Sequence, residues 1–314
     1  MTKRKTVRGV AKGGGGVRLI TAALLRGMRL PEPDEGGSKE ERGRVLVVGG
    51  SPEMPGAAVL AAMAAVRAGA GKLQIATAGS VARLVAVAVP EARVFALPDA
   101  DEGAFDPAGV SLIADYVREA RAVLVGPGMC GGERIGRVTR ALLPLLGEGA
   151  TLVLDADALN VLAEEPRLLA PLAGRAILTP HATEMSDITG IDEDEIKNDP
   201  LATVRAAVGR FGAAVALKGR ETFVAAPGVA AVYVNRAGNV GLATSGSGDT
   251  LAGLIAGLAA RGAEPLTAAV WGVHTHALAG EALTRNTGTL GYLARELPGE
   301  FPRLMSRLAG AERG

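Results

Sequence analysis

Short apolar segments that alternate with helical ones limit most strongly how this chain can fold. Several are continuous runs of Val, Leu, Ile and Ala, which are typical of strands covered on both faces, as in a parallel sheet flanked by helices. The predicted strands are residues 45–48, 72–77, 94–97, 122–126, 152–155, 176–178 and 215–218. The predicted helices between them are residues 57–68, 107–118, 133–146 and 201–211. The pattern therefore predicts an α/β fold with a mostly parallel sheet.

One domain accounts for most of the chain. No linker interrupts residues 43–310 and no internal repeat is found, so we assign 43–314 to a single domain. Residues 1–42 are predicted to be a flexible N-terminal segment with a short helix over 17–28, and residues 1–16 within it look disordered. Residues 222–226 and 231–235 flank Pro227-Gly228 and predict a hairpin at one edge of the sheet.

Charge and cysteine content exclude several classes of protein. The net charge of +1 gives no reason to expect nucleic acid or an anionic membrane as a partner. No apolar run reaches the ~18 residues of a membrane span, and glycines stand where a signal peptide needs an apolar core. Cys130 is the only cysteine, so no intrachain disulfide can form and a reducing compartment is expected. These features predict a soluble cytoplasmic protein.

The sequence Gly246-Ser247-Gly248-Asp249 predicts an anion-binding turn. It opens an amphipathic helix whose apolar residues recur at helical spacing, namely Leu251, Leu254, Ile255 and Leu258. Small residues let the N–H groups of Gly246, Ser247 and Gly248 turn toward one point, where the helix N-terminus adds partial positive charge. Asp249 could take the proton from a hydroxyl that attacks a phosphate. The structural alternative is that Asp249 only caps the helix.

Unusual residues also follow the predicted strands, at the sheet edge where ligands of parallel sheets bind. These residues are Gly49-Gly50-Ser51, Gly126-Pro127-Gly128, Asp155-Ala156-Asp157, Thr179-Pro180-His181 and Lys218-Gly219. Glycine, polar and charged residues at the ends of five predicted strands indicate a binding site.

Each of these residues has a functional and a structural interpretation. Asp155 and Asp157 can hold Mg²⁺, directly or through water, or can cap the helix that begins near Ala158. Lys218 can meet a nucleotide phosphate or lie as an edge lysine with its stem on apolar surface. His181 is a better functional candidate than His274 and His276, which fall on a predicted helix.

The segment from Gly126 to Gly131 is formally a dinucleotide-binding fingerprint, with Asp155 at the end of the next strand. Its position in mid-chain and the stiff Pro127 count against a Rossmann dehydrogenase, although this alternative and a purely structural turn remain open. The sequence contains no P-loop, no Cys/His cluster that suggests zinc and no Gly-x-Ser-x-Gly hydrolase motif.

Taken in order, these motifs resemble the ADP/ATP-dependent NAD(P)H-hydrate dehydratases, a family of the ribokinase-like superfamily. The resemblance runs from about Arg42 to Leu308 and rests on many short motifs in the right order. They are Val47-Val48-Gly49-Gly50-Ser51, Met54-Pro55-Gly56-Ala57-Ala58, Arg67-Ala68-Gly69-Ala70-Gly71, Gly126-Pro127-Gly128, Asp155-Ala156-Asp157-Ala158-Leu159-Asn160, Leu178-Thr179-Pro180-His181, Leu217-Lys218-Gly219, and Gly238-Asn239 to Asp249.

The resemblance implies a ribokinase-like three-layer αβα sandwich and a repair activity. The S-form of NADH or NADPH hydrate would be phosphorylated at its ring hydroxyl by ADP, giving AMP, or by ATP, with Mg²⁺ bridging the phosphates. Elimination of phosphate would then restore NAD(P)H. By the same resemblance, Ala57, Gly128, His181 and Asp249 contact the hydrate, Asp249 activates the hydroxyl, and Lys218, Gly219, Arg220, Glu221, Thr222 and Gly248 contact the nucleotide. The metal ligands stay unassigned.

The family also implies a homo-oligomer, with a tetramer suspected, and an epimerase on a separate chain because 42 N-terminal residues are too few for that domain. Three motifs depart from the family pattern. His-Lys-Gly reads Ser38-Lys39-Glu40, and serine stands at Ser245 where glycine is common. Thr-Pro-His-Pro-Gly-Glu reads Thr179-Pro180-His181-Ala182-Thr183-Glu184, which we expect to loosen that turn. No proposed catalytic group is lost, but the choice between ADP and ATP stays open.

Three other functions remain as alternatives. A ribokinase-like kinase of a small alcohol, of the hydroxymethylpyrimidine or thiazole type, would share the anion-binding turn, although the Thr-Pro-His and Gly-Pro-Gly pair favours the dehydratase. A Rossmann oxidoreductase would bind intact NAD and transfer a hydride. A non-catalytic nucleotide sensor would keep the binding loops without turnover.

Overall fold

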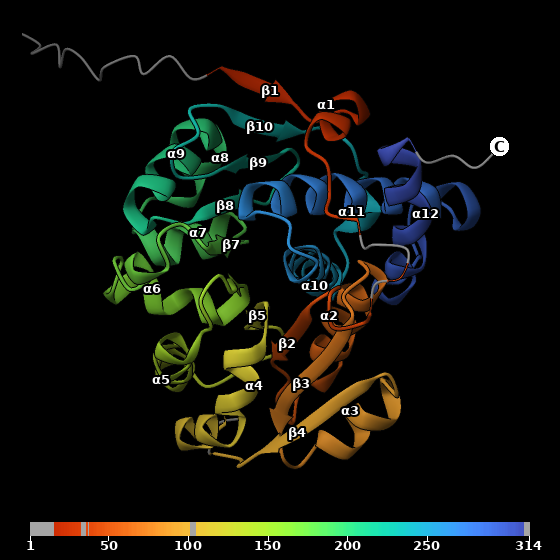
Figure 1. Ribbon diagram of the computed structural model, residues 1–314. Helices are drawn as coiled ribbons and strands as arrows, with labels where there is room; N and C mark the ends of the chain where they lie inside the picture. Colours follow the sequence, from red (N-terminus) through yellow and green to blue (C-terminus); the bar gives the residue numbers. More distant parts are fainter. Residues whose placement is uncertain (1–15, 33–35, 37, 101–104, 311–314) are drawn as a thin grey trace, which may run out of the picture.

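The core of the molecule is one mixed sheet flanked by helices (Figure 1). The computed structural model of the chain describes residues 16–32, 36, 38–100 and 105–310. Across the described part the strand order is β1-β10-β9-β8-β7-β6-β5-β2-β3-β4. The strands are β1 (Val17–Leu19), β2 (Arg44–Val48), β3 (Lys72–Ala78), β4 (Ala92–Leu97), β5 (Ala122–Val125), β6 (Thr151–Leu154), β7 (Ala176–Leu178), β8 (Ala214–Leu217), β9 (Thr222–Ala225) and β10 (Val232–Asn235).

The sheet is mostly parallel, as the continuous apolar runs predict. Every pair from β4 to β8 is parallel, whereas β9 runs antiparallel to both of its neighbours. In β2, Val45 and Val47 pack into the hydrophobic cluster on one face, and Leu46 and Val48 into the cluster on the other. Because both faces of this strand are buried, its sequence has no polar alternation.

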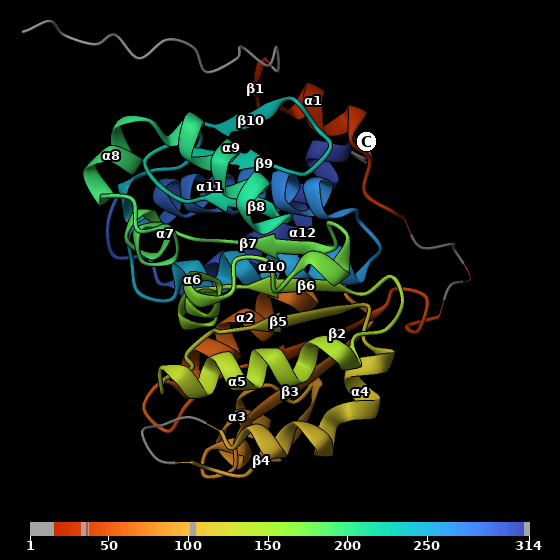
Figure 2. The ribbon, with the colours of Figure 1, turned by 90° about the vertical axis from the view of Figure 1, so that its left-hand side faces the viewer.

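Helices cover both faces and make three layers (Figures 1 and 2). One face carries α2, α10, α11 and α12, and the other carries α4, α5, α6, α7 and α9. The described helices are α1 (Ala22–Gly27), α2 (Pro55–Arg67), α3 (Ala82–Ala88), α4 (Ala114–Glu119), α5 (Glu133–Leu142), α6 (Val161–Glu164), α7 (Ala182–Thr189), α8 (Glu193–Asn198), α9 (Pro200–Phe211), α10 (Ser247–Ala260), α11 (Pro265–Thr287) and α12 (Leu297–Ala309). The predicted αβα sandwich is confirmed. None of these helices is long and apolar enough to cross a membrane.

Helix α10 is buried on all sides, which differs from the predicted amphipathic helix. Every residue from Thr250 to Ala260 is buried, because α10 packs against the sheet, α2 and α11 at once. In the sequence, Ala and Gly residues separate the Leu and Ile residues of this helix, so the large apolar side chains alone indicate a single apolar stripe. A helix that is apolar all round is typical of a position in the core.

The N-terminal segment differs from its prediction as well. The helix expected over 17–28 is a short strand, β1, followed by α1. Strand β1 pairs in parallel with β10, so the β9–β10 hairpin is present but does not form the sheet edge. The segment is tied down after α1, where the indole N–H of buried Trp271 donates to the carbonyl of Met28 at 2.6 Å. The predicted disorder of residues 1–16 falls, except for Gly16, outside the described residues.

Two predicted helices are interrupted. Residues 107–118 form a 3₁₀ segment, Pro107–Ile113, before α4, and residues 133–146 form α5 followed by the 3₁₀ segment Leu143–Leu145. Proline stands in the first turn of both 3₁₀ segments. Because proline lacks an N–H group, Pro144 favours the start of a new helical segment over the interior of a long one, which accounts for the second interruption.

Candidate active site

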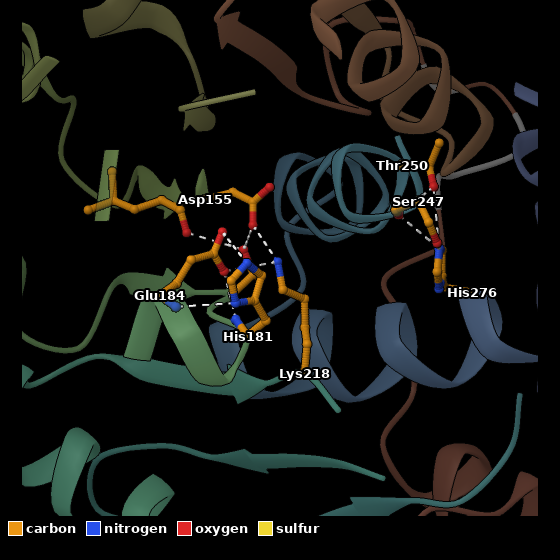
Figure 3. A network of polar contacts seen from close by, with 9 residues as sticks. Asp155, His181, Glu184, Lys218, Ser247, Thr250 and His276 are labelled. Atoms are coloured by element: carbon orange, nitrogen blue, oxygen red, sulfur yellow. Dashed lines mark hydrogen bonds and ion pairs between the residues drawn. The ribbon is translucent and has the colours of Figure 1, made fainter. Parts of the chain in front are cut away.

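The loops after five parallel strands meet at one edge of the sheet, where helix α10 also begins. They follow β2, β5, β6, β7 and β8 and contain the residues that the sequence singles out. Figure 3 shows polar side chains from these loops gathered into one cluster, near a second cluster at the start of α10. The carboxyl ends of parallel strands are the usual place for a ligand in such a sheet.

Asp155 and Lys218 form a buried ion pair at the centre of this edge. The Asp155 side chain is 3% exposed, and its Oδ1 atom lies 3.0 Å from Lys218 Nζ. The same oxygen accepts a hydrogen bond from Thr179 Oγ1 at 2.6 Å. Burial opposes the charged form of Lys218, but the neighbouring carboxylates of Asp155 and Glu184 outweigh it and raise the pKa of the lysine. Lys218 is therefore a fixed cation.

The Asp155 side chain makes no capping hydrogen bond to the 3₁₀ helix Ala156–Asn160 that follows it. The interpretation of Asp155 as a helix cap is therefore wrong. Asp157 does not join the ion pair: burial, and then the nearby Asp187, raise the pKa of its carboxyl group. The two aspartates thus face different surroundings, and no group of three or more acidic, His or Cys side chains suited to a metal is found in the described ranges.

His181 and Glu184 close the turn before α7 and connect it to Lys218. The backbone N–H of His181 donates to Glu184 Oε2 at 2.6 Å, and the backbone N–H of Glu184 donates to His181 Nδ1 at 3.2 Å. Glu184 Oε2 also lies 3.5 Å from Lys218 Nζ. The Ala182-Thr183 departure therefore does not loosen the turn, because this reciprocal capping holds it. The His181 side chain remains 51% exposed.

Asp249 lies in the first turn of α10 but is not its cap. The N-cap is Gly246, whose φ of 86° is a left-handed conformation that favours glycine. Burial, and then the charge of Asp155, raise the pKa of Asp249 to about 6, although Lys218 acts in the opposite direction. Lys218 Nζ lies 3.6 Å from the place where a Cβ atom on Gly248 would be. The ammonium group therefore faces the N-terminus of α10.

A cleft of about 960 Å³ adjoins this helix start. The predicted nucleotide residues Lys218, Gly219, Arg220, Thr222 and Gly248 line it, and so does His181. Glu221 is not among the lining residues; it pairs with Arg236 at 2.9 Å. The remaining walls include apolar side chains, namely Val240, Leu242, Leu251 and Val273. A cleft of this size, mostly apolar with a few polar groups, suits a nucleotide-sized ligand.

Ala57 and Gly128 lie together, outside the walls of that cleft. A Cβ atom on Gly128, whose φ is +66°, would lie 2.7 Å from Cβ of Ala57, so only glycine fits there. One turn further along α2, Leu60 approaches α10 so closely that a Cβ atom on Gly246 would overlap its side chain. The start of α2 thus stands beside the start of α10.

Sequence reasoning missed two members of the site. Glu184 had a usable signal, since it stands three residues after His181 at the spacing of a capping box. His276 had none: it follows His274 by two residues on a helix, and only the packing of α11 against α10 brings it to Ser247.

Comparison with known proteins agrees with this geometry. Residues 45–303 match the family model of the NAD(P)H-hydrate dehydratases. The ADP-dependent (S)-NAD(P)H-hydrate dehydratase of Xanthomonas campestris is 49% identical over 93% of this chain and 97% of its own length. The chain belongs to the NAD(P)H-hydrate dehydratase family.

Two further relatives extend the family comparison. The crystal structure of the Bacillus subtilis ADP/ATP-dependent NAD(P)H-hydrate dehydratase, co-crystallised with ATP/Mg²⁺, has a TM-score of 0.77 and 30% identity, covering 95% of this chain and all of that one. A bifunctional NAD(P)H-hydrate repair enzyme of Moorella thermoacetica is 37% identical over 93% of this chain but only 54% of its own length. The family resemblance drawn from the motifs is confirmed.

Proposed function

We propose that this chain dehydrates the S-form of NADH or NADPH hydrate in a reaction that consumes ADP. The observation that carries the proposal is the Asp249 carboxylate, held in the first turn of α10 near the fixed ammonium group of Lys218. A base with a pKa of about 6 is ionised at neutral pH and can still accept a proton readily. The names of the closely related dehydratases support the same activity.

The nucleotide is assigned to the cleft beside α10. Lys218 and the N–H groups of Gly246 and Gly248 provide positive charge and donors for its phosphates, because the first N–H groups of a helix have no acceptor within it. The Ser247 N–H, expected to join them, already donates to the carbonyl oxygen of Thr244 at 3.2 Å. Thr222 and Arg220 line the same cleft. Its apolar walls suit a nucleobase.

The hydrate is assigned to the space between the starts of α2 and α10. Ala57 and Gly128 carry no large side chain, and they lie against each other at the start of α2. The exposed His181 imidazole stands at the adjoining edge of the cleft. In this arrangement Asp249 lies between the ring hydroxyl and the nucleotide phosphates.

The reaction proceeds in two steps. The ring hydroxyl oxygen attacks the β-phosphorus of ADP, a new P–O bond forms as the bond to AMP breaks, and the hydroxyl proton passes to Asp249. Phosphate then leaves the ring carbon with the electrons of the C–O bond, the neighbouring carbon gives up a proton to water, and the electrons of that C–H bond restore the double bond of NAD(P)H. Lys218 and the helix N-terminus stabilise the charge on the transferred phosphoryl group.

The residues present fit a Mg²⁺ ion that arrives with the nucleotide. Mg²⁺ usually binds one or two carboxylates together with substrate phosphates and keeps several waters. Asp155 Oδ1 already pairs with Thr179 and Lys218, and Glu184 Oε2 with His181 and Lys218. Among the described residues, none donates a hydrogen bond to Asp155 Oδ2 or to the Asp249 carboxylate. These two carboxylates would hold the ion. When bound, Mg²⁺ would neutralise charge on the phosphates.

One assay tests the proposal. The purified protein is mixed with NADH hydrate, Mg²⁺ and ADP or ATP, and the absorbance of reduced nicotinamide is followed. We expect nucleotide-dependent recovery of NADH, with AMP and phosphate formed from ADP. No recovery with either nucleotide by the folded protein refutes the proposal. A stable phosphorylated product would indicate a small-alcohol kinase instead.

A further inference from the structure

His276 touches the same helix turn that carries Asp249. It lies in the middle of α11 and is 7% exposed. Its Nε2 atom is 3.0 Å from the carbonyl oxygen of Ser247, and 3.3 Å from both Ser247 Oγ and Thr250 Oγ1 (Figure 3). One ring nitrogen of α11 thus meets three oxygen atoms of the first turn of α10.

The protonation of this ring follows from its partners. A carbonyl oxygen only accepts, so Nε2 carries the hydrogen and donates to Ser247 O. Burial lowers the pKa of His276 to about 4, despite the hydrogen bond to Ser247. The ring is therefore neutral at physiological pH, with the hydrogen on Nε2, and it adds no charge beside Lys218.

The turn has few other supports. Its N-cap is Gly246, which has no side chain, and no side-chain cap bond is present. Thr250 Oγ1 donates to Ser247 O at 2.8 Å, and the Thr250 N–H donates to Gly246 O at 3.1 Å. The hydrogen bond from His276 is a side-chain tie that reaches this turn from another element. It acts at Ser247, next to Gly248 and two residues from Asp249.

We propose that His276 is a positioning residue for the dehydration reaction: it fixes the first turn of α10 and so sets the place of the Asp249 carboxylate relative to Lys218. The proposal rests on the proposed function, in which Asp249 takes the hydroxyl proton. A base misplaced by about 1 Å can cost roughly 100-fold in rate, because the reacting atoms must meet at close range. His276 lines the cleft assigned to the nucleotide, but its ring nitrogen Nε2 bonds to Ser247 and Thr250 and not to Asp249 or Lys218.

Three variants separate this role from simple core packing. His276→Leu removes the hydrogen bond and replaces the imidazole with an apolar side chain of similar size. His276→Gln restores an N–H donor at about the same reach. Thr275→Val is the matched control, because Thr275 is the adjacent residue of α11, fully buried, and its hydroxyl has no hydrogen-bond partner in the described chain.

We expect His276→Leu to lower kcat about 10- to 100-fold, by the geometric argument above, while KM for the hydrate changes less than threefold. His276→Gln should recover most of the lost rate, and Thr275→Val should keep the wild-type kcat. Amide hydrogen exchange of Ser247 and Thr250, whose N–H groups donate to Thr244 O and Gly246 O, should accelerate in His276→Leu and not in Thr275→Val. A residue that only packs would change the unfolding midpoint without changing kcat per folded molecule.

The exchange measurement needs no turnover, so the two proposals can fail separately. A wild-type protein without dehydratase activity refutes the proposed function, while exchange still tests whether His276 holds the turn. A folded His276→Leu protein with kcat within twofold of wild type, or with unchanged amide exchange at Ser247 and Thr250, overturns the positioning role. A Gln variant as slow as the Leu variant overturns it as well.

Discussion

Gly253 of α10 lies so close to α2 that a Cβ atom on it would stand 2.6 Å from the Cα of Ala61 and would overlap its carbonyl oxygen. One turn later, Gly257 meets Ala65 in the same way. The two helices therefore touch backbone to backbone. Because we propose that the hydrate binds between the starts of α2 and α10, this contact would set the spacing of the two walls of that site.

The first prediction concerns this contact. Gly253→Ala should destabilise the protein by about 1–3 kcal/mol, since the added methyl group has no room. Gly209→Ala is the matched control, because Gly209 is also inside a helix, α9, but has open space around its Cβ position. It should stabilise by about 0.5–1 kcal/mol. Urea unfolding of the three proteins measures both effects, and equal effects of the two substitutions would contradict the close approach.

The second prediction concerns Asp249. Asp249→Asn keeps the shape of the side chain but removes the base, so kcat should fall about 10²- to 10⁴-fold. ADP binding, measured by calorimetry, should persist because Lys218 and the helix N–H groups remain. Asp249 is not the cap of α10, so the helix start has no need of its carboxylate. Near wild-type turnover in a folded Asp249→Asn protein would remove Asp249 from the mechanism.

The same substitution should change stability in a pH-dependent way. The pKa of Asp249 is about 6 in the folded protein, above its ordinary value of 3.8, so its stabilising contribution is complete at pH below 4 and is lost as the pH rises through 6. At pH 7.5 the ionised, buried carboxylate costs up to about 3 kcal/mol. Asp249→Asn should therefore unfold at a higher temperature than wild type at pH 7.5, and the difference should shrink by pH 4.5. A difference in unfolding temperature that is independent of pH would show that burial does not destabilise the ionised carboxylate.

The fourth prediction concerns Lys218. Lys218→Met keeps the aliphatic stem and removes the ammonium group, so ADP affinity should fall about 10- to 100-fold, as expected for the loss of a charge-assisted hydrogen bond worth roughly 1.5–3 kcal/mol. Hydrate binding should change less. Lys197→Met, which removes an exposed lysine paired with Glu193, is the control and should leave both affinities unchanged. An unchanged ADP affinity in Lys218→Met would make this lysine a purely structural partner of Asp155.

The strands and the parallel sheet could be predicted because strands that are buried on both faces have continuous runs of apolar residues. Strand β7, for example, has the bounds that its apolar run predicts. The strand-end loops could be predicted for a similar reason, since parallel topology brings the residues after β6, β7 and β8 to one edge. Asp155, His181 and Lys218 meet there through contacts that local patterns alone do not specify.

What could not be predicted depends on packing between distant segments. Strand β1 forms by pairing with the otherwise unpaired edge of β10. Its three residues have no strong sequence pattern of their own, so the sequence does not predict a strand there. Asp155 bonds to Thr179 and Lys218 and does not cap the following helix, because of the orientation of its side chain in the folded chain. The meeting of His276 with Ser247 follows from the way α11 crosses α10.

Trp271 is the only tryptophan in the sequence, and its indole N–H donates a hydrogen bond to the carbonyl of Met28. Intrinsic tryptophan fluorescence therefore comes from one junction, between the end of α1 and helix α11, and not from the nucleotide cleft. Local opening of a terminal segment costs less free energy than global unfolding. A red shift in emission that precedes the loss of helical circular dichroism would record the N-terminal segment leaving the domain, with no label attached.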